Sequence, residues 1–177
     1  RRAAIAAGSA GMALGVLGLA AERVEARRAS TGEFSSGGLG LSFAEFEARY
    51  GPGTAGQGAQ IYAIGGETYA VLGTAGTDAV TSIYWTAKPQ QSVEPDEALA
   101  KIAPFFPDDA KLREVYTTPA AGITPFATVH LYKSAGLAKA LAGGPTVTSG
   151  NFLVAFQLVG GFDTTVTGVN AFVGAKP

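Results

Sequence analysis

The chain has 177 residues, of which 47% are hydrophobic and only 15% charged, and its net charge at pH 7 is −1. This composition predicts a folded chain, and the length left after the first thirty or so residues fits one domain. The near-neutral charge excludes nucleic acid as a general partner, because that binding needs a basic face. The chain has no Cys, which excludes disulfides and thiolate chemistry.

An uncharged segment follows two arginines at the start of the chain. As a helix, residues 3–21 would be about 28 Å long, close to the thickness of the hydrocarbon core of a bilayer. With Arg1 and Arg2 in front of it, this segment resembles a twin-arginine signal peptide. The alternative is a retained membrane anchor, in which small residues spaced by four form a stripe for helix packing. The stripe consists of Ala7, Gly11 and Gly15.

Both interpretations predict an extracytoplasmic protein, either secreted or periplasmic, or held at the membrane by the uncleaved segment. A third alternative, a buried Ala/Gly-rich helix of a soluble domain, stays open. The predicted organisation is a signal peptide or anchor helix over residues 1–26, a flexible linker rich in Gly and Ser over 27–41, and a folded domain over 42–177.

The domain opens with a well-specified helix. Ser42 and Glu45 form an S-x-x-E capping box, in which each side chain accepts a hydrogen bond from an otherwise unpaired backbone N–H. Gly51 and the proline after it end the helix. The apolar face of the helix carries Phe43, Phe46 and Tyr50.

Two more short helices and seven strands are predicted further along. One helix spans residues 95–105, because Pro95 suits a first helical turn, and Ser134 caps the other. Gly65-Gly66 is a hairpin signal between the first two strands. The strands are predicted over 60–64, 68–72, 79–86, 112–118, 126–132, 151–159 and 165–173.

This order, helix and then strands, occurs three times. Strands that follow one another as hairpins predict an antiparallel sheet, and helices that return to one face would cover that face. The predicted fold is therefore α+β, with an antiparallel sheet of six to seven strands and three short helices on one face, preceded by an apolar amino-terminal helix.

The sequence around the first helix resembles a known family of exported modules. Residues 40–52, GLSFAEFEARYGP, combine a Gly-apolar-Ser turn, an acidic capping residue and a closing Gly-Pro. This pattern resembles the helix that opens small modules of the β-lactamase-inhibitor-protein and outer-membrane-assembly lipoprotein type. The chain departs from those lipoproteins by lacking a lipidation Cys, and from the inhibitors by lacking a disulfide. The resemblance implies the fold and a protein-binding character, and no residue roles.

The sequence offers little for catalysis or for a cofactor. His130 is the only His, and its alternation with Val129 and Leu131 predicts a side chain that points away from the core. No G-x-S-x-G turn presents a nucleophilic Ser, and no Walker-type glycine loop or EF-hand run occurs. We therefore expect no catalytic residues, no cofactor and no metal site.

Aromatic and apolar strands point to a binding surface instead. Residues 151–159 are apolar on both faces, and three short helices would cover only one side of the sheet. The second face is then either core, covered by other parts of the chain, or an open surface for a protein partner. The residues expected on this open face are Tyr84 or Trp85, depending on register, together with Thr128, His130, Tyr132 and Gln157.

The predicted function is an exported, non-catalytic module that binds a protein of unknown identity. One alternative is an accessory subunit of a membrane complex, anchored by the single amino-terminal helix. Another is a hydrolase whose site carries no recognisable motif.

Overall fold

The computed structural model describes residues 34–56, 58–74, 77–118, 127–142, 149–158 and 165–174. The predicted signal or anchor segment, with Ala7, Gly11 and Gly15, lies outside these residues. Of the helices within the described ranges, none is both long enough and apolar enough to cross a bilayer.

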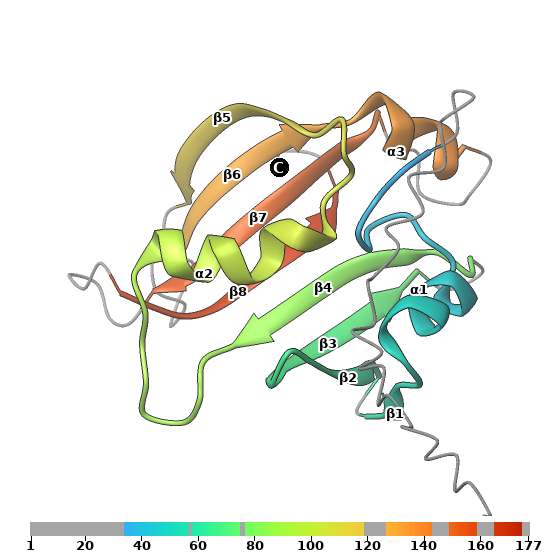
Figure 1. The fold of residues 1–177 in the computed structure, drawn as a ribbon. Helices are drawn as coiled ribbons and strands as arrows, with labels where there is room; N and C mark the ends of the chain where they lie inside the picture. The colour runs from blue at the N-terminus through green and yellow to red at the C-terminus, as the bar shows by residue number, and fades with distance from the viewer. Residues whose placement is uncertain are drawn as a thin grey trace, which may run out of the picture.

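The described part of the chain forms one antiparallel sheet with three α-helices (Figure 1). The strand order is β1-β2-β3-β4-β8-β7-β6-β5, so two four-stranded meanders meet at β4 and β8. The elements are α1 (Phe43–Tyr50), β1 (Thr54–Ala55), β2 (Gln60–Ile64), β3 (Glu67–Gly73), β4 (Val80–Thr86), α2 (Pro95–Ile102), the 3₁₀ turn η1 (Ala103–Phe105), β5 (Lys111–Thr118), β6 (Ala127–Lys133), α3 (Ala135–Ala140), β7 (Asn151–Leu158) and β8 (Val166–Val173).

The α+β class, the antiparallel sheet and the three helices are confirmed. The predicted count of six to seven strands was wrong, because the described sheet has eight. The missing strand, β1, has only two residues, and both are exposed. A segment that short carries no alternation of apolar and polar residues, so no sequence pattern marks it.

Capping chemistry sets the start of α1. The Ser42 hydroxyl accepts the Glu45 N–H at 3.2 Å, and the Glu45 carboxylate accepts the Ser42 N–H at 2.9 Å. The predicted capping box is therefore present. Phe46 on the inner face of this helix is fully buried, and its ring lies 4.9 Å from that of Tyr62 on β2. The cap thus fixes where α1 begins, and Phe46 fixes which face packs on the sheet.

The three helices share one hydrophobic core on one side of the sheet. Phe46 of α1, Ile102 of α2 and Leu137 of α3 are all fully buried in the same cluster. Opposite them, the sheet contributes inward side chains such as Ile83 of β4 and Val154 of β7. Figure 1 shows α2 crossing in front of β7 and β8. We call this side of the sheet the helix face.

Residues 34–41, predicted as the end of a flexible linker, belong to this core. Leu39 is fully buried, and its N–H donates to the carbonyl of Phe105 at 2.9 Å. A Cβ on Gly38 would lie only 2.8 Å from Cδ1 of Ile83, so glycine is needed for this close approach. The linker prediction was wrong here because glycines that allow tight packing have the same sequence signature as glycines that give flexibility.

We predict that Leu39→Ala lowers the free energy of unfolding by about 3 kcal/mol, because it opens a cavity in the core. Leu112→Ala is the matched control, since Leu112 is 50% exposed and should cost about 0.5 kcal/mol. Urea unfolding followed by Trp85 fluorescence measures both. Equal, small effects for the two variants would contradict the placement of residues 34–41 in the core.

Candidate functional site

The six residues predicted to form one open face lie on both faces of the sheet. Trp85 pairs with Val169 and is 2% exposed, in the core. On β6, three of the predicted residues pair with the inward-facing residues of β7, so they also lie on the helix face. These three are Thr128, His130 and Tyr132, all half-buried. Only Tyr84 and Gln157 lie on the opposite face.

Tyr84 and Gln157 contact each other across β8. The Tyr84 hydroxyl donates to Oε1 of Gln157 at 2.7 Å. Between them lies Gly168, where a Cβ would be 2.7 Å from the tyrosine oxygen. The glycine therefore lets the ring lie flat over the sheet and reach β7. Burial raises the pKa of Tyr84, so its hydroxyl stays a donor at neutral pH.

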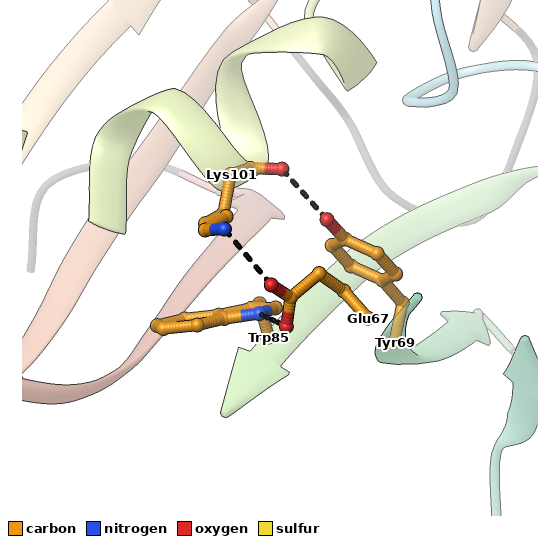
Figure 2. A network of polar contacts seen from close by, with 4 residues as sticks. All are labelled: Glu67, Tyr69, Trp85 and Lys101. Carbon is orange, nitrogen blue, oxygen red and sulfur yellow. Dashed lines mark hydrogen bonds and ion pairs between the residues drawn. The ribbon is translucent and has the colours of Figure 1, made fainter. Parts of the chain in front are cut away.

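Glu67 is the centre of a polar network that joins α2 to the sheet (Figure 2). The Glu67 carboxylate accepts from Nε1 of Trp85 at 3.1 Å and from Nζ of Lys101 at 2.8 Å. Tyr69 on β3 donates its hydroxyl to the carbonyl of Lys101 at 3.2 Å. These bonds satisfy a buried indole and attach the last turn of α2 to β3 and β4. Their role is structural, since every polar group in the network is engaged with another.

The helix face is least covered at β5 and β6. Leu112 is 50% exposed and Val115 is 53% exposed, and they are the large apolar side chains most open to solvent among the described residues. They pair with Tyr132 and His130 of β6, which places all four on the same face. We call Leu112 and Val115 the apolar strip. The sequence did not predict this strip, because alternation shows which side chains of a strand share a face and does not show whether a helix covers that face.

His130 faces the helix side, so the prediction that it points away from the core was wrong. Its ring lies 4.8 Å from the ring of Phe156, and its buried Nδ1 has no hydrogen-bond partner within the described ranges. Burial lowers the pKa of His130, and the negative charge of Asp96 offsets this in part. Among the described residues, no hydrogen-bond partner at Nδ1 orients this imidazole.

Ser134 and Asp109 form a short hydroxyl–carboxylate hydrogen bond at the start of α3. The buried Ser134 hydroxyl donates to Asp109 and accepts the N–H of Leu137 at 2.8 Å, while Asp109 also accepts the N–H of Gly136 at 2.9 Å. Burial raises the pKa of Asp109, but these hydrogen bonds outweigh it and the pKa is lowered. The pair therefore stabilises the start of α3.

Metal ligands do not gather in the part of the chain that the structure describes, where no group of three His, Cys, Asp or Glu residues could hold an ion. Comparison with family models, with curated proteins and with solved structures finds no match for this chain. The resemblance of residues 40–52 to exported binding modules therefore stays a prediction. The geometry does bring together one uncovered apolar strip and one partly buried polar network.

We predict that the Glu67 network makes stability depend on pH in the acid range. Hydrogen bonds from Lys101 and Trp85 lower the pKa of Glu67 below its ordinary 4.5. A carboxylate with a lowered pKa contributes stability above pH 4.5 that is lost as the pH falls through the folded-state pKa. Glu67→Gln should cost about 1 kcal/mol at pH 7 and flatten this acid loss. Urea titrations from pH 3 to pH 7 measure the free energy of unfolding of both proteins, with the exposed Glu94→Gln as the control. If the free energy of unfolding of Glu67→Gln fell with pH as steeply as that of the original protein, the prediction would be wrong.

His130 should produce a second, separate pH dependence. Because its folded-state pKa lies below the ordinary 6.5, the unfolded chain takes up the proton first, and stability falls as the pH drops below 6.5. His130→Phe removes the unpartnered nitrogen and should raise the free energy of unfolding by about 1 kcal/mol at pH 6 while abolishing this slope. A less stable variant would mean that the imidazole makes a required hydrogen bond, and an unchanged pH dependence would mean that another group titrates in this range.

Proposed function

We propose that this chain is an exported, non-catalytic module that binds another protein through the apolar strip. The observation that carries the proposal is the exposure of Leu112 and Val115, at 50% and 53%, side by side on one strand. Exposed apolar side chains that neighbour one another favour a contact with a partner, because burial removes their surface from water.

The position of the strip makes it accessible. β5 is the last strand in the order of the described sheet, and it is eight residues long, whereas β1 at the other edge has only two. Behind the strip, the half-buried rings of His130 and Tyr132 extend the apolar surface toward the core. Aromatic side chains are common anchors in interfaces because they bury a large area with few rotatable bonds. The partner surface that fits is therefore apolar at its centre.

The non-catalytic part of the proposal is supported by how the chemically competent groups are used. His130 has no orienting partner at Nδ1 among the described residues, and Ser134 is buried within a helix cap. The Glu67 carboxylate is engaged with Trp85 and Lys101. Export, in turn, is supported by the uncharged segment behind Arg1 and Arg2 in the sequence.

A photo-crosslinking experiment tests the docking surface. A photo-reactive phenylalanine analogue replaces Leu112 or Val115 in cells that produce the protein, and the same analogue at exposed Glu94 is the matched control. We expect crosslinked products of one discrete mass from positions 112 and 115 only. Leu112→Ser/Val115→Ser should abolish the complex and lower the free energy of unfolding by only about 1 kcal/mol, because both side chains are half exposed.

The proposal fails if positions 112 and 115 give no product, or the same products as position 94. It also fails if the double serine variant unfolds, because the strip would then be part of the core.

A further inference from the structure

Tyr84 and Gln157 lie on the side of the sheet away from the three helices, which we call the outer face. Gly168 of β8 belongs to this face as well, and it is buried although it has no side chain. The Tyr84 ring covers it, because a Cβ on Gly168 would lie 2.7 Å from the tyrosine oxygen and 3.1 Å from Cε2. One face of the ring therefore rests on β8, and Tyr84 is partly exposed on the other.

The ring is fixed in this position by a bond at each end. Its Cβ is attached to β4, and its hydroxyl donates to Oε1 of Gln157 on β7 at 2.7 Å, so the side chain bridges β8 between them. A side chain that is already held in one orientation loses little conformational entropy when a ligand packs on it. The outer face thus presents an aromatic ring surface that is prepared for a contact.

Two side-chain amides beside the ring have hydrogen-bond donors to offer. The oxygen of Gln157 accepts from Tyr84, and the oxygen of Asn170 accepts from the Ser82 hydroxyl at 2.8 Å, so both amides are held in one orientation. Within the described ranges neither amide nitrogen donates a hydrogen bond, which leaves two N–H groups on each. Gln157 is exposed and Asn170 is partly exposed, so a ligand on the ring can reach these donors.

The surroundings of the ring carry no charge. The outer-face residues next to Tyr84 on the neighbouring strands and on β4 itself are Ala70, Ser82, Thr86, Gly168, Asn170 and Phe172. A phosphate or carboxylate ligand would find no cation among them, and an ammonium ligand would find no carboxylate. The chemistry of this surface therefore suits a neutral ligand that has an apolar side and hydroxyl groups around it.

We propose that Tyr84, with Gln157 and Asn170, binds a sugar ring of a neutral oligosaccharide. The C–H groups of a pyranose stack on the negative face of an aromatic ring, and its hydroxyl oxygens accept from the two amides. Phe172, a second partly exposed ring on the outer face, lies two residues beyond Asn170 on β8, which favours a chain of sugars over a single one. The apolar strip lies on the helix face, so this site is independent of the proposed protein contact.

Amide NMR on the full chain tests the site with three neutral probes, cellohexaose, laminarihexaose and chitohexaose. At least one should cause saturable shifts at Gly168, at Asn170 and in the side-chain amide of Gln157. Tyr84→Leu keeps an apolar side chain over the glycine but removes the aromatic face, and it should weaken binding of that probe about tenfold. Tyr84→Phe keeps the face and loses only the hydroxyl, so its affinity should stay within about threefold of the original.

A second pair of variants tests the amide donors. Gln157→Glu keeps the oxygen that accepts from Tyr84 and removes both N–H donors, so it should weaken the same probe about fivefold. Gln91→Glu makes the same change at an exposed position before α2 and is the matched control. Leu112→Ser/Val115→Ser should leave the affinity unchanged, which separates this site from the apolar strip. The proposal is overturned if none of the three oligosaccharides binds, if Tyr84→Leu binds as tightly as the original protein, or if Gln91→Glu weakens binding as much as Gln157→Glu.

Discussion

The pairing of β4 with β8 is the contact on which the rest of the molecule depends. It joins residues 82–86 to residues 168–172, and it is the only link between the two meanders in the described sheet. On the helix face it sets Ile83 beside Ala171 and Trp85 beside Val169, all at the centre of the core. The α2 helix contacts both strands, and the Glu67 network ties its last turn to β3 and β4. Without this long-range pairing, the surface of β4 and β8 that α2 covers would not form.

Local chemistry predicted much of the fold, because the capping box, the glycine pair and the proline at a first turn act within a few residues. Ser42 and Glu45 cap α1, Ser134 caps α3, and Gly65 and Gly66 have the positive φ angles that a tight hairpin needs. Contacts between distant segments were beyond such patterns. The burial of Leu39 depends on Phe105 and Ile83, which lie more than forty residues away.

The candidate surface was predicted less well than the fold, because the sequence does not show which face of a strand points into the core. Alternation shows that His130 and Val129 lie on opposite faces, but it does not show which face is inside. On β6 the more apolar set faces away from the helices: Val129 is 4% exposed there, whereas His130 is half-buried on the helix face. The pairing of His130 with Val154 decides which face of β6 is inside. These two residues are separated in the sequence by α3 and the connection that follows it. A pattern of two residues cannot encode it.

Helix length explains why part of the helix face stays exposed on this fold. The α-helices have eight, eight and six residues, about 9–12 Å each, against a sheet of eight strands spaced about 4.8 Å apart. Three such rods cannot cover a sheet that wide, so some of the helix face must stay open. Because α2 lies over the central strands, the uncovered part falls at β5, where Leu112 and Val115 are exposed.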